Sequence, residues 1–289
     1  MHDAQRSRKR LLATLGVTGG IMIAEVIGGL LSGSLALLAD AGHMLTDLLA
    51  IIVAFVALTL SSMPADEKRT YGYKRLEILA ALINGVALVV LSVSIFYEAV
   101  ERWLDPQPIQ LATMALVAAV GLAANLVGLW LLHVGHDNLN MRGAFLHVLG
   151  DTLSSMGVLI GAGVMALTGW TAIDAVLSAM IGVIIILTSL KLLREVIEVL
   201  LEAAPRGVNT EAIRSSIGDV DGVAGVHDLH VWSIAGDMPA LSAHVVLTDA
   251  VTDADRILAH IQEKLRAVHA IEHSTVQLER GKLDGCTHC

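Results

Sequence analysis

Six long apolar runs constrain the fold of this chain more than any other feature of its sequence. They lie at about residues 11–31, 36–60, 76–98, 109–133, 142–168 and 173–200, and a helix needs about 20 apolar residues to cross a bilayer. The runs are apolar on all sides, whereas the helices of a soluble protein keep a polar outer face. Charged residues make up only 16% of the 289 residues. The sequence therefore predicts an all-α membrane domain of six transmembrane helices.

Lysine and arginine are unevenly divided among the segments that connect these runs. The N-terminal tail and the loop at 61–75 are rich in them, whereas the loops at 32–34, 105–110 and 168–172 contain none. Because basic loops stay in the cytoplasm, we expect both termini to be cytoplasmic, in a bacterial inner membrane. No small-residue cleavage site follows the first run, so a removable signal peptide is not expected. The basic residues form no extended patch, which argues against a nucleic-acid partner.

The composition changes at about residue 205 to that of a small soluble domain. Amphipathic patterns predict helices at 208–217 and 253–268, and alternating patterns predict strands at 226–234, 240–248 and 273–279. The sequence Gly236-Asp237-Met238-Pro239 is typical of a turn between the first two strands. We therefore predict a cytosolic tail at 1–10, the six-helix membrane domain at 11–204, and an α+β cytosolic domain of order α-β-β-α-β at 205–289.

A His-x-Leu-x-Asp pattern occurs twice inside apolar runs, as His43 to Asp47 and as His147 to Asp151. Ionisable residues at membrane depth are expensive and usually mark an ion path. The spacing of four puts each His and Asp on one helix face, so two such helices could offer two imidazoles and two carboxylates to one ion. The alternative is that each pair only joins neighbouring helices by a hydrogen bond.

This ligand set suits a tetrahedral Zn²⁺ and fits Mg²⁺ or Ca²⁺ poorly, since those ions prefer oxygen ligands. Ligand type alone does not exclude Co²⁺, Ni²⁺ or Cu²⁺. The same groups bind protons, so the arrival of a metal would release them. A site that faced the two sides in turn would therefore exchange metal for protons.

Three further polar residues lie in the apolar runs, and each has more than one possible role. Asp40 is either a spare ligand or, as we favour, a cap or hydrogen-bond partner at the start of its helix. Asn125 either supports a ligand or joins helices by a hydrogen bond. Glu25 has no evident partner in the sequence, and we expect it to line a water-filled entrance.

The soluble domain carries a second set of metal-ligand types. It comprises His227, His230, His244, Glu279, Cys286 and Cys289. The cysteines form a C-x-x-C at the end of the chain, which indicates metal binding in a reducing cytosol and a disulfide in an oxidising compartment. The alternative for the strand histidines is simple solvation or burial in the core. We interpret His133, His136, His269 and His273 as incidental surface residues.

Four segments resemble the cation diffusion facilitator family of metal transporters, and in particular its zinc-transporting branch. Residues 34–47, SLALLADAGHMLTD, are similar to the second-span signature, and residues 71–77, YGYKRLE, to the motif that leads into the third span. Residues 147–151 match the ligands of the fifth span, and residues 227–232, HDLHVW, match a motif of the cytosolic domain. The resemblance covers nearly the whole chain.

This resemblance implies a homodimer, held partly by a ferredoxin-like cytosolic domain, that carries out metal/proton antiport. It implies that the transport ligands are His43, Asp47, His147 and Asp151, and that His227, His244 and Glu279 bind zinc together with the two cysteines. Some members hold another metal in the loop after the second span. That site is not expected here, because the loop has Asp66 but no His, and Lys74 stands where some relatives carry His.

We therefore expect a zinc exporter, with Zn²⁺ as its substrate and as a regulatory ligand, and not an enzyme. A membrane metalloenzyme would need a general base and an open coordination position, and the chain contains no H-E-x-x-H. A membrane metal sensor would leave the paired intramembrane ligands without a purpose. A broader exporter of Co²⁺, Cd²⁺ or Ni²⁺ remains an alternative.

Overall fold

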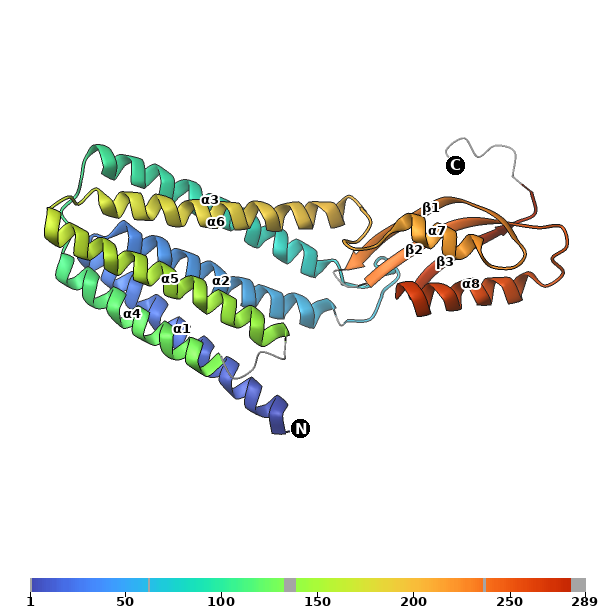
Figure 1. Cartoon of the computed structure of the whole chain (residues 1–289), viewed down its shortest axis with the longest axis horizontal. Coiled ribbons are helices and arrows are strands. Elements are labelled where there is room, and N and C mark those ends of the chain that lie inside the picture. The colour runs from blue at the N-terminus through green and yellow to red at the C-terminus, as the bar shows by residue number, and fades with distance from the viewer. Residues whose placement is uncertain (1, 62, 133–138, 236–237, 282–289) are drawn as a thin grey trace. The chain divides into compact units, whose positions relative to one another are not determined.

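The computed structural model describes residues 2–61, 63–132, 139–235 and 238–281 (Figure 1). All six apolar runs form helices, as predicted. Several helices continue beyond the apolar run into polar sequence, so α1 begins at His2 and α3 ends at Leu104. The six helices are α1 His2–Ser32, α2 Leu35–Ser61, α3 Leu76–Leu104, α4 Leu111–Leu132, α5 Leu139–Thr168 and α6 Ile173–Leu200.

The helical region has the length and surface of a membrane domain. Among the described residues, five of these helices contain segments long and apolar enough to span a bilayer, and α1 contributes a shorter apolar segment, Gly16–Ser32. Large apolar side chains such as Ile83, Val90 and Ile160 lie more than half exposed. Lipid can cover such surfaces, while the backbone groups of a helix are satisfied internally. The protein is therefore an integral membrane protein.

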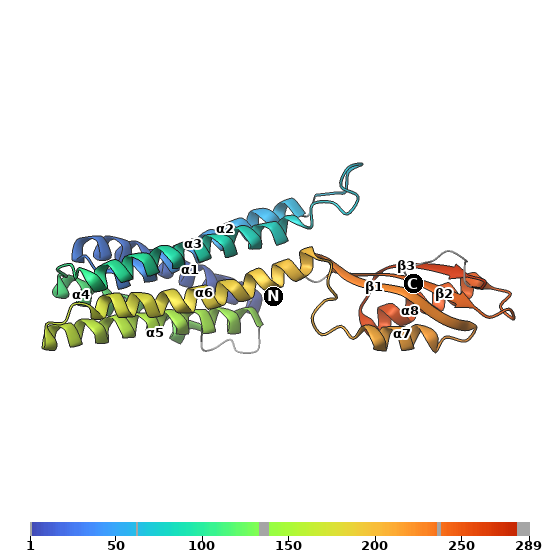
Figure 2. The same ribbon diagram turned by 90° about the horizontal axis from the view of Figure 1, so that it is seen from above.

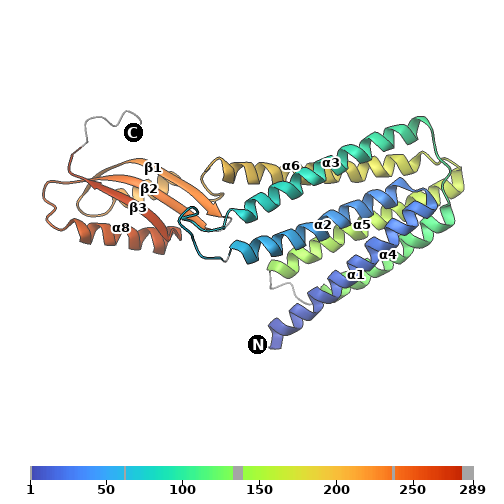
Figure 3. The same cartoon turned by 180° about the vertical axis from the view of Figure 1, so that it is seen from behind.

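The chain forms two compact units, Met1–Val53 with Ile83–Lys191 and Ala54–Leu82 with Leu192–Cys289. In the first unit α4 packs against both α1 and α5 (Figures 1 and 3). Small residues permit this close approach: a Cβ atom at Gly28 would lie 2.5 Å from a methyl carbon of Val117. Close backbone contact through glycine is a common way of packing helices in membranes.

The apolar contacts of the first unit concentrate around the beginning of α2. Ala36 and Leu37 are buried against α4 and α5, and Ala39 is buried against α3 and α6. Toward its other end α2 is much less covered, and Leu49 and Ile52 are about half exposed. The bundle is therefore tightly packed beside the α1–α2 turn and more open farther along α2.

Asp174, in the first turn of α6, fixes the beginning of α2. Its carboxylate accepts hydrogen bonds from Ser34 Oγ at 2.6 Å, from the backbone N–H of Leu35 at 2.6 Å and from that of Ala36 at 3.3 Å. Arg102 of α3 lies 3.9 Å away. The first N–H groups of a helix lack partners within the helix, so Asp174 acts as an N-cap supplied by another helix.

The soluble part of the second unit follows the predicted α-β-β-α-β order. Its elements are α7 Thr210–Gly218, β1 Val223–Ala235, β2 Met238–Leu247, α8 Ala254–His269 and β3 His273–Glu279. The sheet order is β1-β2-β3, with β1 antiparallel and β3 parallel to β2. Helices α7 and α8 cover one face of the sheet (Figure 2). Leu241, Val245 and Ile261 form part of the core between them.

The predicted turn at 236–239 is partly wrong. Ala235 pairs with Met238, so Met238 and Pro239 belong to β2 and the connection is shorter than expected. Gly236 and Asp237 lie outside the described residues. Proline can occupy this place because it lies near the end of the strand.

An irregularity in β1 decides which side chains share a face of the sheet. His227 pairs with His244 and His230 with Ser242, so β1 has one residue more than β2 between these pairs. Asp228, within this bulge, has a left-handed φ of 48°, a conformation that Asp tolerates better than most residues. The bulge places His227 and His230 on the face with His244, opposite the helices.

We predict that Asp174→Ala destabilises the protein by about 1–2 kcal/mol, since it removes an N-cap together with a charged acceptor. Thermal unfolding of the purified protein in detergent measures this loss. Asp105→Ala is the matched control, because Asp105 is an exposed loop carboxylate bonded by Gln107. Equal unfolding temperatures for the two variants would contradict the capping role.

Candidate metal sites

Helices α2 and α5 bring the four predicted membrane ligands together. Asp47 Oδ2 lies 3.6 Å from His43 Nε2 and 3.7 Å from His147 Nε2. His147 Nε2 in turn lies 3.6 Å from Asp151 Oδ2. The two imidazole rings have their centroids 6.4 Å apart, nearly edge to face. Asp47 thus lies between the two histidines, and the side chains from both helices converge.

Three of the separations in the quartet approach those that a zinc ion requires. Ligand atoms about 2.0–2.1 Å from a tetrahedral Zn²⁺ lie about 3.4 Å from one another, only slightly closer than these three contacts. The remaining pairs lie farther apart, since no three of the four residues have ligand atoms all within 4.8 Å of one another. Asp47 Oδ2, Asp151 Oδ2 and His43 Nδ1 are buried without a hydrogen-bond partner among the described residues. Buried polar atoms normally have one. The carboxylate oxygens that face the imidazoles are therefore free to coordinate a cation.

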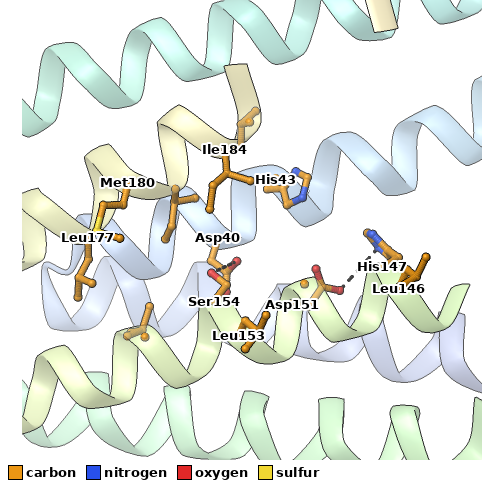
Figure 4. A pocket seen from close by; sticks show the side chains of 15 residues that line it. Asp40, His43, Leu146, His147, Asp151, Leu153, Ser154, Leu177, Met180 and Ile184 are labelled. Carbon is orange, nitrogen blue, oxygen red and sulfur yellow. Dashed lines mark hydrogen bonds and ion pairs between the residues drawn. The ribbon is translucent and has the colours of Figure 1, made fainter. Parts of the chain in front are cut away.

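A cavity of about 500 Å³ adjoins this quartet, with Asp40, His43, His147 and Asp151 in its wall (Figure 4). Its remaining lining is largely apolar, including Leu177, Met180, Ile181 and Ile184 of α6. The side chain of His147 is 41% exposed, whereas that of Asp151, one helical turn deeper, is 3% exposed. The site is therefore open beside His147 and closed beyond Asp151.

The other intramembrane polar residues make contacts between helices. Asp40 accepts a hydrogen bond from Ser154 Oγ at 2.8 Å, which agrees with the favoured role as a hydrogen-bond partner. It does not cap α2, because the helix begins at Leu35 and Asp174 supplies the cap. Asn125 donates to Ser155 Oγ at 3.3 Å, which is the helix-joining alternative.

Glu25 does not line an entrance. Its side chain is 1% exposed, and it is absent from the wall of the cavity beside the quartet.

On the open face of the sheet, His227, His244 and Glu279 form a compact cluster. One ligand atom from each lies within 4.8 Å of the others, the only such group of His, Cys, Asp and Glu in the described part of the chain. Glu279 Oε2 lies 3.1 Å from His227 Nε2, and Oε1 lies 2.7 Å from His244 Nδ1. Two imidazoles and a carboxylate are suitable zinc ligands, and a fourth ligand would complete a tetrahedral site.

The electrostatics of this cluster favour an ionised carboxylate. Burial would raise the pKa of Glu279, but hydrogen bonding to His244 and His227 outweighs it and holds the pKa below its ordinary value. An ionised Glu279 is the form that coordinates a cation. Gln277 also donates to Glu279 Oε1, at 3.0 Å.

His230 does not join the cluster, although it lies on the same face. It is exposed and lies 2.8 Å from Asp228 Oδ1, a contact that lowers the pKa of Asp228. Asp228 also lies 3.6 Å from His244 Nε2, so it orients a ligand. Asp228 and Gln277 were not among the predicted site residues. The signal for Asp228 was its position between two candidate histidines within the HDLHVW motif. Cys286 and Cys289 lie outside the described residues.

The loop that precedes α3 has no sign of a further metal site among its described residues. The carboxylate of Asp66 accepts hydrogen bonds from the backbone of Lys68 and Arg69 and from Tyr73 Oη. The bonds from the Arg69 and Lys68 backbones lower the pKa of Asp66. This carboxylate therefore stabilises the turn of its own loop.

Two of the four histidines interpreted as incidental have specific contacts. His269 bonds Ser216 Oγ at 2.8 Å, and the His273 ring lies edge to face with Tyr71, with 5.5 Å between centroids. His133 and His136 lie outside the described residues.

Comparison with known proteins gives two family matches. The cation efflux transmembrane domain matches residues 11–201, and the cytoplasmic domain of cation efflux proteins matches residues 205–281. The chain is 43% identical to the zinc transporter ZitB of Pectobacterium atrosepticum, over 100% of this chain and 90% of that protein. It is 38% identical to the cadmium, cobalt and zinc/H(+)-K(+) antiporter of Bacillus subtilis, over 96% of this chain and 91% of that one.

A solved structure is also similar to part of the chain. The metal-bound C-terminal domain of the CzcD transporter from Cupriavidus metallidurans is 30% identical, covers 25% of this chain and 99% of its own, and gives a TM-score of 0.24.

We predict that His244→Ala and Glu279→Ala each weaken zinc binding by the soluble domain at least about tenfold, because each removes a ligand or its partner. Zinc titration of the full chain in an Asp151→Ala background, which removes one of the candidate membrane ligands, measures this affinity. His230→Ala is the matched control and should leave it nearly unchanged. A loss in His230→Ala as large as that in His244→Ala would contradict the three-residue cluster.

Proposed function

Because this chain belongs to the cation efflux family, a family of transporters, we propose that it exports Zn²⁺ from the cytoplasm in exchange for protons. The observation that carries this proposal is the convergence of His43, Asp47, His147 and Asp151 from α2 and α5. In the described part of the chain, Asp47 Oδ2 and Asp151 Oδ2 have no hydrogen-bond partner. A hydrogen-bonded pair that only joined helices would satisfy these atoms instead.

The chemistry of exchange follows from the ligands themselves. Imidazoles bind a metal through a neutral nitrogen and carboxylates bind it when ionised, so Zn²⁺ competes with protons for the same atoms. Zn²⁺ arriving from the cytoplasm displaces protons into it. When the site faces the other side, protons replace the metal and complete the cycle.

The uneven packing around α2 supports a site that can open to one side of the membrane and then to the other. The basic loops predict that the end of α2 near Ser61 is cytoplasmic. The open part of the site then faces the cytoplasm, since Asp47 and His147 lie on that side of His43 and Asp151. The buried residues around Leu37, with the Asp174 cap, close the opposite side. Export requires this closure to open while the cytoplasmic side closes.

We propose roles for the remaining parts of the chain as well. The division proposed is a cytosolic tail at 1–10, a transport domain at 11–204 and a cytosolic domain at 205–289, with both termini in the cytoplasm of a bacterial cell. The cytosolic domain dimerises the protein, and zinc bound at His227, His244 and Glu279 stabilises the dimer and regulates transport. Completed by a fourth ligand, such as Cys286 or Cys289, the site would hold its metal tightly, which suits such a role better than rapid passage.

A broader metal range is a second candidate, favoured by the ligand set and by the relative named a cadmium, cobalt and zinc antiporter. Two imidazoles and two carboxylates accept several divalent transition metals. We predict that Co²⁺ and Cd²⁺ compete with Zn²⁺ for flux in proteoliposomes, whereas Mg²⁺ and Ca²⁺ in excess do not. Competition by Mg²⁺ would indicate an all-oxygen site and contradict the quartet.

We predict that Asp47→Ala and Asp151→Ala each abolish zinc flux and the accompanying pH change in proteoliposomes, because each removes a charged ligand. Flux is followed with a zinc-sensitive dye and pH with a second dye inside the vesicles. Asp66→Ala, in the loop before α3, is the control and should keep its flux. Size-exclusion chromatography checks that the dimer remains folded, and full flux in Asp151→Ala would disprove the assignment.

A further inference from the structure

Glu25 of α1 is a buried acid that the quartet leaves unused. Its side chain is 1% exposed, and neither carboxylate oxygen has a hydrogen-bond partner among the described residues. An unpaired carboxylate in an apolar interior is costly when ionised, so such a group is normally neutral, paired or bound to a cation. Its place in the bundle therefore requires an explanation.

The bundle makes room for this carboxylate where α1 meets α4. A Cβ atom at Gly121 of α4 would lie 3.0 Å from Glu25 Oε1 and 3.5 Å from Ser155 Oγ of α5. Any larger residue at position 121 would therefore crowd the acid. Ser155 in turn accepts a hydrogen bond from Asn125. Glu25 thus points toward a small polar region that α4 and α5 share.

This polar region leads along α5 to the metal quartet. Ser155 lies one helical turn from Asp151, and the neighbouring Ser154 bonds Asp40 of α2. The charged groups that act on Glu25 from the surrounding helices are Asp151 of α5 and Asp40 of α2, and both repel a negative charge at Glu25. Burial without a hydrogen-bond partner among the described residues therefore favours the neutral acid at Glu25, and a charge there would add to the repulsion between these acids.

A divalent cation at the quartet changes this balance. It neutralises Asp151 and adds positive charge near Glu25, so attraction replaces repulsion for an ionised Glu25. The bond that breaks is the O–H bond of the acid, and its proton ends in bulk water.

From this arrangement we infer that Glu25 is a second protonation site, distinct from the metal ligands, whose proton is released when metal binds and regained when it leaves. The inference rests on the proposed metal/proton exchange and names one carrier of the exchanged proton. Glu25 acts through charge across the polar region and does not contact the metal.

The test counts the protons released when Zn²⁺ binds to the full-length protein in weakly buffered, K⁺-free detergent solution with a pH-sensitive dye. Release by the Asp47→Ala variant is subtracted to leave the protons that belong to the membrane site. We expect Glu25→Gln to bind Zn²⁺ but to release about one proton fewer per metal ion than the unmodified chain. Glu25→Asp, which keeps an acid, should restore the count.

Two further variants keep the test decisive. Glu25→Met, an apolar replacement suited to a buried membrane position, should lose the same proton, and it serves if Glu25→Gln does not fold. Glu98→Gln is the matched control, because Glu98 is an acid of another helix, α3, that lies half exposed and already pairs with Arg102 at 2.9 Å. Its proton count should equal that of the unmodified chain.

The possible outcomes separate the inference from the proposed function. If the unmodified chain releases protons and both Glu25→Gln and Glu25→Met release the same number, Glu25 is not a protonation site while the exchange stands. If the unmodified chain transports Zn²⁺ without moving protons, the exchange itself is wrong and the role of Glu25 falls with it. A deficit in both variants that Glu25→Asp repairs establishes the site.

Discussion

The placement of carboxylates inside an apolar helical bundle is the constraint on which the rest of the structure depends. Each buried acid must be hydrogen-bonded, matched by a cation or kept neutral, because the bundle offers little else to solvate it. The structure satisfies its acids in different ways, and the difference indicates what each one does. Asp174 accepts hydrogen bonds from Ser34 and the α2 backbone and is structural. Asp47 and Asp151 face imidazoles, and one oxygen of each has no hydrogen-bond partner among the described residues, as expected of a metal ligand.

The packing along α2 also decides how exposed the membrane ligands are. Asp174 fixes one end of α2, and the apolar contacts of Ala36 and Leu37 surround that end. Farther along the helix these contacts thin out, and His43 and Asp47 lie where the change occurs. A ligand pair at the border between a closed and an open part of a bundle can alter its exposure through small helix movements, which a site buried uniformly in the core could not do.

The two candidate metal sites differ in the rigidity of the secondary structure that carries their ligands. The membrane quartet is divided between two helices. Its three contacts of 3.6–3.7 Å must shorten slightly around an ion, and its other ligand atoms, which lie farther apart, must draw together. The sheet cluster is held on paired strands, with Glu279 already bonded to both histidines. A site whose ligands must move together to bind a metal ion suits release and exchange of that ion. A site whose ligands are already in contact suits a metal ion that stays bound. This contrast supports transport at the first site and regulation at the second.

The sequence by itself determined the six helices, the α-β-β-α-β order and the two His-x-Leu-x-Asp pairs, because hydrophobic length, periodicity and the spacing of four are local properties. Only the tertiary structure decided which distant groups meet. The cap of α2 by Asp174, the burial of Glu25 beside Gly121 and the position of His230 outside the His227, His244 and Glu279 cluster depend on contacts between elements far apart in the chain. The bulge at Asp228 had no sequence signal either, since pairing with β2 creates it.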